Sequence, residues 1–508
     1  MSENVFPAPQ ALARPVDLAT IFVGILLLAL LILMIGIVAG VAGTELAMLA
    51  TSLVMLIASV TPFALTRAVP VERRHILLSL WAMGMGVYFA LPVFTQYFFL
   101  TEPVDGITRI RNIQPEDILN GQLTALLALS CAYIGYFYPV GRFVAQVLPG
   151  PKVDWSHNAT LMVALVMIPA GWFVTIGGQL GLIPSRLGSG ALGSIGTASY
   201  MGLGLLTIMM LKYRSRPALL LALLLLVPTM LFAFLTGSKR FVLSPVMCIA
   251  LGYFVCVRRI QLRWVVLGAI SLVMLYPIAT FYREFVLRGY SVGLGDVITN
   301  PGRIIFLLSS FLASANFSEY LEAGIASSTS RLDALGILTV IVRDTPDIVP
   351  FQGGWTIGYV FVSFIPRIIW AGKPSIGIGQ WVTDNYGSEG MITSNTGSTW
   401  VGELFFNFGF AGVVIGMLII GMYFRILHET LFRSMTVPAM FASIVVLWAT
   451  CTTIEMNLIA PFNGTIFTLV PVLVAHIAVR TLSQPNRPIG GPQSPVLQQT
   501  SQPPGEPL

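Results

Sequence analysis

The sequence predicts an all-α polytopic membrane protein, and three observations lead to this fold class. The chain has 508 residues, of which 56% are hydrophobic and only 10% charged. Its mean hydropathy of +0.83 is far above that of an ordinary soluble domain. Apolar runs long enough to cross a hydrocarbon core of about 30 Å, which takes roughly 20 helical residues, recur along most of the chain. We place about twelve crossings, within a range of about 10 to 14, near residues 18–39, 45–66, 76–99, 121–138, 158–182, 196–211, 217–235, 241–257, 264–282, 410–427, 438–458 and 464–480.

The charges between these runs predict which way they cross. If the N-terminus lies inside, the inner segments hold 16 of the 28 basic residues but only 6 of the 22 acidic ones. Short loops rich in Lys and Arg stay on the cytoplasmic side. We therefore expect both termini in the cytoplasm. The basic pI then reflects arginines at the inner membrane surface, so it calls for no nucleic-acid partner.

The spacing of the runs divides the chain into four parts. Residues 1–282 form a bundle of about nine transmembrane helices, residues 410–480 contribute three more, and the Pro-rich segment 481–508 is a disordered cytoplasmic tail. Between the two bundles, 283–409 is an extracytoplasmic loop of 127 residues. A loop of this length is usually functional or has its own structure, so we expect the catalytic cleft there.

Two stretches of the long loop are apolar but too short for a full crossing. Residues 304–317 and 355–370 are interpreted as amphipathic or re-entrant helices at the membrane surface. The following segment, 372–412, is rich in Gly, Ser, Thr, Asn and aromatic residues. Trp, Tyr and Asn side chains are suited to sugar rings and hydroxyls, so this segment favours a carbohydrate cleft, with an ordinary polar loop as the alternative.

Several basic residues contradict the charge trend, because they fall on the outer side. They are Lys239, Arg240, Arg283, Arg288, Arg303, Arg331, Arg343, Arg367 and Lys373. Ionisable residues at membrane depth indicate a functional site by default. The alternative is that each extends its charged end to the interface or pairs with a nearby acid such as Glu284, Asp296 or Asp344.

Glu403 lies just before the apolar run at 410–427, within the sequence TWVGELFFNFGFAG. A carboxyl group beside such an apolar surface suits acid–base chemistry near neutral pH. The alternative is an acidic residue in the first turn of a helix, where the macrodipole favours it.

Four stretches together resemble the bacterial oligosaccharide repeat-unit polymerases, the Wzy-like O-antigen and exopolysaccharide polymerases. They are FIPRIIWAGKP (364–374), VGELFFNFGFAGVVIGMLIIG (401–421), TGSKR (236–240) and YREFVLRG (282–289). The resemblance covers about residues 230–425; before that, the chain matches only in having many helices. It implies a GT-C-like plan in the bacterial inner membrane. Such enzymes transfer a glycan from undecaprenyl pyrophosphate onto another lipid-linked repeat unit at the outer, periplasmic face.

This resemblance implies roles for the residues singled out above. Arg283, Arg288, Arg367, Lys239, Arg240 and Lys373 are expected to form a cradle for the pyrophosphate, stabilising its developing charge without a metal. Glu403 is the first choice for the base that activates the acceptor hydroxyl, and Asp384 is the second. Asn407, Trp381 and Trp400 would line the sugar cleft. We expect no metal or other cofactor. A membrane-bound co-polymerase that regulates chain length is a possible partner.

Two other functions fit the sequence less well. An O-antigen ligase shares the plan and chemistry but uses a different acceptor. A lipid-linked sugar flippase or other transporter would also have about twelve helices, but carriers generally show two related halves, and no internal repeat is found here.

Overall fold

Helices provide all the regular structure in the part of the chain that the computed structural model describes, and no strand occurs in it. The described residues are 43–66, 75–94, 113–148, 150–151, 153–180, 182, 195–235, 239–257, 302, 306, 309, 333–363, 365, 370, 372–373, 377–387 and 396–483.

The helices fall into three sets along the chain. The first set is α2 (Thr44–Thr66), α3 (Ile76–Phe89), α4 (Leu91–Phe94), α6 (Pro115–Phe137), α7 (Pro139–Val147), α8 (His157–Gln179), α10 (Ala198–Tyr213), α11 (Arg216–Leu235) and α12 (Lys239–Cys256). Three short helices follow, namely α17 (Ala334–Asp344), α18 (Trp355–Ser363) and α19 (Ile378–Tyr386). The last set is α20 (Trp400–Leu427), the π-helical turn η5 (His428–Phe432), α21 (Val437–Cys451) and α22 (Ile459–Ser483).

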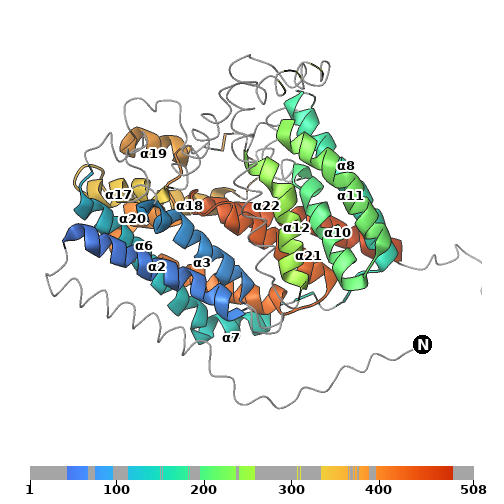
Figure 1. Ribbon diagram of the computed structural model, residues 1–508, viewed down its shortest axis with the longest axis horizontal. Coiled ribbons are helices and arrows are strands. Elements are labelled where there is room, and N and C mark those ends of the chain that lie inside the picture. Colours follow the sequence, from blue (N-terminus) through green and yellow to red (C-terminus); the bar gives the residue numbers. More distant parts are fainter. Residues whose placement is uncertain are drawn as a thin grey trace, which may run out of the picture.

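These helices pack as two connected groups (Figure 1). In one group, α20 runs along α6, while α2 packs against both α3 and α6. In the other, α10 contacts α8, α11 and α12. The C-terminal helices join the groups, because α21 contacts α3, α10 and α12, and α22 contacts α8 and α18. The short helices α17 and α19 lie beside each other, and α17 also packs on α6 and α20.

Close contact between α6 and α20 depends on two glycines. A Cβ atom on Gly135 would overlap the carbonyl oxygen of Leu418, and one on Gly421 would overlap that of Ala132. Small residues at such positions let two helix backbones approach closely, which is a common way to pack helices in a membrane. The α6–α20 pair is therefore fixed by backbone contact as well as by side-chain packing.

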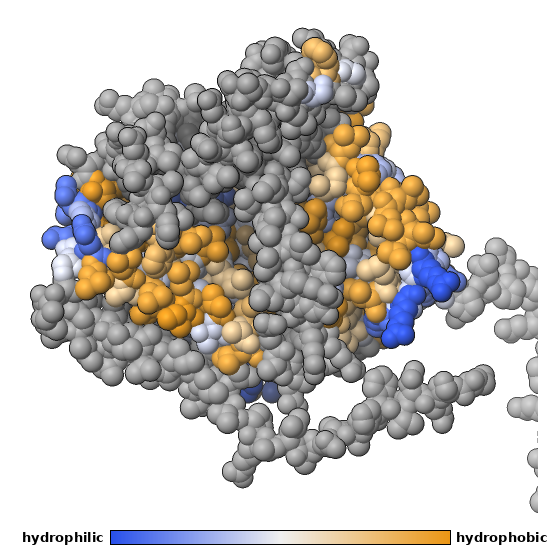
Figure 2. Space-filling view, in the orientation of Figure 1, coloured by the Kyte–Doolittle hydropathy of each residue, from blue (hydrophilic) through white to orange (hydrophobic). Residues whose placement is uncertain are grey.

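Apolar side chains cover much of the outer surface of the bundle. Figure 2 shows them as two broad hydrophobic areas, one on each helix group. On α8 and α11, Val166, Phe173, Leu220, Leu224 and Val227 are each between 67% and 71% exposed. Seven helical stretches among the described residues are long and apolar enough to cross a membrane. A helix with so much exposed apolar surface needs a lipid surrounding, so the chain is a membrane-embedded helical protein.

The structure refines the positions expected from the sequence. Helices occur at each of the ten predicted crossings that fall on described residues, whereas 18–39 and 264–282 lie outside those residues. The largest difference is at α20, which begins at Trp400, ten residues before the predicted start at 410. Thr399 caps this helix by accepting a hydrogen bond from the Gly402 backbone N–H (3.0 Å). The segment 372–412 is therefore partly helical, since it contains α19 and the first part of α20.

The long segment between the two bundles also has more structure than expected. The predicted short apolar helix at 355–370 is present as α18, which ends at Ser363, before Pro366. Helix α17 was not predicted. Its start is marked by Asp333, whose side chain accepts a hydrogen bond from the Gly336 N–H (2.8 Å), and most of its residues are buried. The apolar stretch 304–317 lies largely outside the described residues.

Candidate functional site

A break in α20 is the central feature of the candidate site. Gly409 has φ of 63° and ψ of −151°, which divides the helix into a short part that ends at Phe408 and a long part that starts at Phe410. Only glycine adopts this backbone conformation readily. In a membrane, irregular backbone is tolerated where protein or a cavity surrounds it. Because such strained backbone conformations cluster at functional sites, the break at Gly409 indicates a candidate site.

The segment 350–354 supplies hydrogen bonds that the broken helix lacks. The carbonyl oxygens of Phe406 and Asn407 accept from the backbone N–H groups of Gln352 (2.9 Å) and Gly353 (3.2 Å). Gly353 and Gly354 both have positive φ, which lets this segment turn tightly against α20. The break is thus held in place by a part of the chain more than 50 residues away.

Asn407 connects the two segments through its side chain. Its amide nitrogen donates to the Thr356 hydroxyl (2.7 Å) and to the Glu403 backbone carbonyl (2.7 Å). Its amide oxygen accepts from the Gly354 N–H (2.8 Å). Asn407 is only 1% exposed. These bonds fix the orientation of the amide and link α18 to the short part of α20.

Glu403 lies one helical turn before Asn407 and is completely buried. Its Oε2 atom accepts a hydrogen bond from the Leu458 backbone N–H (2.6 Å), and the hydroxyls of Thr356 and Ser398 interact with the same carboxyl group. Oε1 has no hydrogen-bond partner of normal geometry among the described residues. A buried carboxyl oxygen without a donor is costly, which marks Glu403 as a candidate for proton transfer.

The two candidate sugar-binding tryptophans are packed against other side chains. Trp400 is 4% exposed, donates from Nε1 to the Thr453 carbonyl (2.8 Å) and stacks on Trp81 with ring centroids 6.2 Å apart. The Trp381 ring lies 5.0 Å from Phe406 and 6.0 Å from Trp355, measured between ring centroids. Together with Asn407, these residues support the walls of the site and do not form an open sugar surface in this structure.

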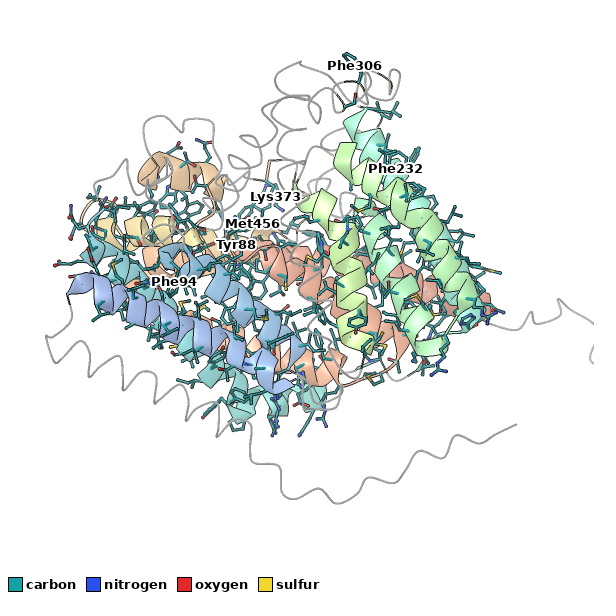
Figure 3. All side chains as sticks on the ribbon, viewed as in Figure 1. Tyr88, Phe94, Phe232, Phe306, Lys373 and Met456 are labelled. Carbon is teal, nitrogen blue, oxygen red and sulfur yellow. The ribbon has the colours of Figure 1, made fainter. Side chains whose placement is uncertain are left out.

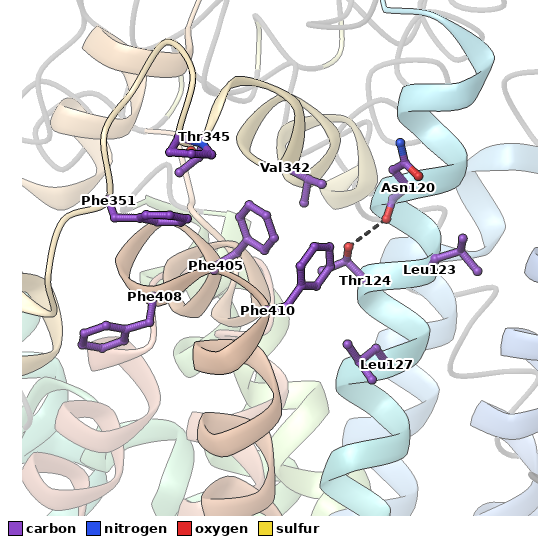
Figure 4. A pocket seen from close by; sticks show the side chains of 12 residues that line it. Asn120, Leu123, Thr124, Leu127, Val342, Thr345, Phe351, Phe405, Phe408 and Phe410 are labelled. Atoms are coloured by element: carbon purple, nitrogen blue, oxygen red, sulfur yellow. Dashed lines mark hydrogen bonds between the residues drawn. The ribbon is translucent and has the colours of Figure 1, made fainter.

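A hollow of about 780 Å³ lies next to the break (Figure 4). Most of its lining is apolar or aromatic, and its polar members are Asn120, Thr124 and Thr345. The residues that line it are Asn120, Leu123, Thr124, Leu127, Val342, Thr345, Pro346, Phe351, Phe405, Phe408, Gly409 and Phe410. Phe351, Phe408 and Phe410 are 48%, 48% and 56% exposed. The aromatic groove, as we call these twelve residues, is thus open at its surface and suited to a hydrocarbon chain.

Charged residues lie at one end of the aromatic groove. Arg343 directly follows the lining residue Val342, and its Nε donates to Asp344 Oδ1 (2.7 Å). The same guanidinium lies 4.0 Å from Oδ2 of Asp117, one turn of α6 before Asn120. The hydrogen bond to Asp344 raises the pKa of Arg343 above its ordinary value. Sequence reasoning named Arg343 only as one of several unusual outer cations, so its place beside the groove is new.

Three of the six residues predicted to form the pyrophosphate cradle fall within the part of the chain that the structure describes. Arg283, Arg288 and Arg367 lie outside the described residues. Lys239 and Arg240 form the first turn of α12. Lys373 donates from Nζ to the Ile365 carbonyl (3.1 Å) and lies 5.7 Å from the centre of the Tyr359 ring (Figure 3). These contacts place the Lys373 side chain beside α18 and the residues that follow it.

Asp384, the second choice for a base, is on the exposed side of α19. It accepts a hydrogen bond from the Gln380 side chain one turn earlier (2.8 Å). Glu403 and Asn407 are thus brought together, whereas the contacts described for Asp384 and Lys373 place neither beside them. Within the described residues, no group of three or more His, Cys, Asp or Glu side chains could hold a metal ion.

The comparison with protein families gives one match. Residues 160–457, more than half of the chain, match the family model described as "Domain of unknown function (DUF8712)". The matched segment includes the broken helix, Glu403 and Asn407. No curated protein and no solved structure matches the chain.

Proposed function

The chain belongs to the DUF8712 family, and we propose that it is a membrane glycosyltransferase that polymerises lipid-linked oligosaccharide repeat units. The donor would be a glycan on undecaprenyl pyrophosphate, and the acceptor another lipid-linked repeat unit. In this proposal the chain crosses a bacterial inner membrane about twelve times, follows a GT-C-like plan, has both termini in the cytoplasm and acts at the periplasmic face. The products would be O-antigen, capsule or exopolysaccharide.

The observation that carries the proposal is the break at Gly409. This residue lines the aromatic groove and lies two residues after Asn407, which is bonded to the backbone of the buried Glu403. A lipid-linked sugar needs an apolar surface for its chain and polar groups where the chain ends. The groove offers aromatic side chains along its length, with Arg343 at one end. The sequence resemblance over residues 230–425 supports the same class of substrate.

The proposed reaction needs only groups on this chain. The acceptor hydroxyl attacks the anomeric carbon of the donor glycan, and its proton passes to Glu403. The bond between that carbon and the pyrophosphate oxygen breaks, and undecaprenyl pyrophosphate leaves. Arg283, Arg288, Arg367, Lys239, Arg240 and Lys373 would stabilise the charge on the departing oxygens, which is electrostatic catalysis by fixed cations.

Purified full-length protein mixed with a lipid-linked repeat unit tests the proposal. We expect a ladder of longer lipid-linked glycans on a gel. Arg283→Ala and Arg367→Ala should abolish the ladder, whereas Arg214→Ala, which removes an exposed arginine at the end of α10, should leave it unchanged. Wild-type chain lengths in both site variants would refute the cradle. Transfer of a single glycan to a different acceptor would instead identify a ligase.

The role of Glu403 is tested by Glu403→Gln. Glutamine keeps an oxygen for the Leu458 N–H and nearly the same volume, so the variant should fold and elute normally. It has no carboxylate to accept the acceptor's proton, so we expect the transfer rate to fall by about 10²- to 10⁴-fold. Full activity would exclude Glu403 as the base.

A further inference from the structure

Helix α7 has an apolar stripe that none of the described residues covers. Val140, Phe143, Val144 and Val147 are 43%, 70%, 37% and 77% exposed. Their spacing of three and four residues puts them on one side of the helix. The helix directly follows α6, a membrane-length helix that ends at Phe137. The stripe is therefore at one end of the membrane-spanning bundle.

Another side of α7 is fixed to the end of α20. Gly141 is the buried residue of α7, and a Cβ atom there would meet Arg425 Cβ at 2.8 Å and the Met422 carbonyl oxygen at 3.1 Å. Because this contact leaves no space for a side chain, α7 is held across the end of α20. The exposed stripe then keeps a defined direction, away from the bundle.

Two exposed arginines, Arg142 within α7 and Arg433 at the end of η5, share one acid. Arg142 Nε lies 3.5 Å from Glu429 Oε1, and Arg433 Nη1 lies 2.5 Å from Glu429 Oε2. The buried Arg425 also contacts Glu429 Oε1, at 2.7 Å. Three guanidinium groups therefore face one carboxylate. The side chains of Arg142 and Arg433 remain 66% and 60% exposed, and each guanidinium has five N–H donors, more than one carboxylate can engage.

We propose that α7 lies in the membrane interface and that Arg142 and Arg433 bind the phosphate of an anionic phospholipid, whose acyl chains cover the apolar stripe. The net positive charge of the cluster complements a phosphate headgroup. The stripe matches the apolar side of an interfacial amphipathic helix. Glu429 and Arg425 hold the arginines at a fixed position beside it. This site is at the end of α20 opposite to Glu403 and is independent of the proposed reaction.

The test uses purified full-length protein in bilayer discs that contain spin-labelled phosphatidylglycerol or spin-labelled phosphatidylcholine. The measured quantity is the selectivity for phosphatidylglycerol in the motionally restricted lipid. An arginine near an anionic surface contributes about 1 kcal/mol, which is about fivefold in affinity. We expect the selectivity for phosphatidylglycerol to be at least fivefold lower in the variant R142Q/R433Q. Arg425 still pairs with Glu429 in this variant, so no buried carboxylate is left alone.

The control variant is R214Q/R216Q, which removes two exposed arginines, one at the end of α10 and one at the start of α11. It should keep the selectivity for phosphatidylglycerol. Unchanged selectivity in R142Q/R433Q, or an equal loss in the control, would overturn the proposal. A spin label on Val147→Cys should be more accessible to oxygen than to a water-soluble nickel complex. The reverse accessibility would show that α7 faces water and would also overturn it.

Discussion

At the residue scale, the Asn407 side chain makes three hydrogen bonds in the candidate site. Its amide joins Gly354, Thr356 and the Glu403 carbonyl. We expect Asn407→Ala to lower the free energy of unfolding by about 2 kcal/mol, because it leaves buried partners without hydrogen bonds. Asn385→Ala is the matched control, since the Asn385 amide donates a hydrogen bond to the Trp381 carbonyl (2.8 Å) within its own helix. Thermal unfolding in detergent compares the two. Equal losses of stability in the two variants would show that the hydrogen bonds of Asn407 contribute no more than that of Asn385.

His75 provides a prediction about pH. It lies just before α3, its Nδ1 is 2.7 Å from the Tyr136 hydroxyl, and its ring is 4.7 Å from that of His428. Burial lowers the pKa of His75 to about 4, with further lowering from Arg425 and Arg142 and an opposing effect of Glu429. The unfolded chain therefore binds more protons than the folded one between about pH 6.5 and 4, and stability falls as the pH drops through this window.

The corresponding experiment measures the melting temperature at pH 7 and pH 5. His75 should account for a loss of about 2 kcal/mol between these values, and His75→Gln should remove that part of the loss. His157→Gln, at the start of α8 and outside this cluster, should retain it. If His75→Gln has the same pH dependence as the unaltered chain, another group is responsible.

At the scale of the elements, the break in α20 depends on Gly409. Its backbone conformation is confined to glycine, and an added Cβ atom would lie 3.2 Å from the Phe351 ring. We expect Gly409→Ala to destabilise the protein by about 1 to 3 kcal/mol. Gly358→Ala, in the middle of α18 with open space around its Cβ position, should be neutral or slightly stabilising. A stable Gly409→Ala protein would mean that α20 can straighten at this point.

The sequence predicts long apolar helices well and the site poorly, for identifiable reasons. Helices such as α8 and α11 are single apolar runs of membrane length, so hydropathy alone locates them. Helix α17 has only 11 residues, so an Asp at the cap and a short apolar run are too weak a signal to predict it within a long loop. The positive φ of Gly409 cannot be predicted from the sequence FNFGFAG. The bond from Leu458 to Glu403 joins residues 55 positions apart, and one sequence holds no record of such a contact.

At the scale of the whole molecule, the proposed function requires that the loop 283–409 lie on the periplasmic side of the membrane. Gly372→Cys and Arg214→Cys place a thiol at two exposed positions, which the charge distribution assigns to opposite faces. In a background without the four native cysteines, a membrane-impermeant reagent should label Gly372→Cys in intact spheroplasts. It should label Arg214→Cys only after permeabilisation. The opposite pattern would contradict both the orientation and a periplasmic active site.

The contact between α6 and α20 indicates that this protein's folding unit begins before the segment that matches the family. The family match starts at residue 160, after α6, yet the backbones of these two helices touch at Gly135 and Gly421. Helix α6 also contributes Asn120, Leu123, Thr124 and Leu127 to the aromatic groove. A chain trimmed to residues 160–457 would therefore expose the tightest contact face of α20 and lose one wall of the groove. The segment shared across the family is smaller than the structure that supports it.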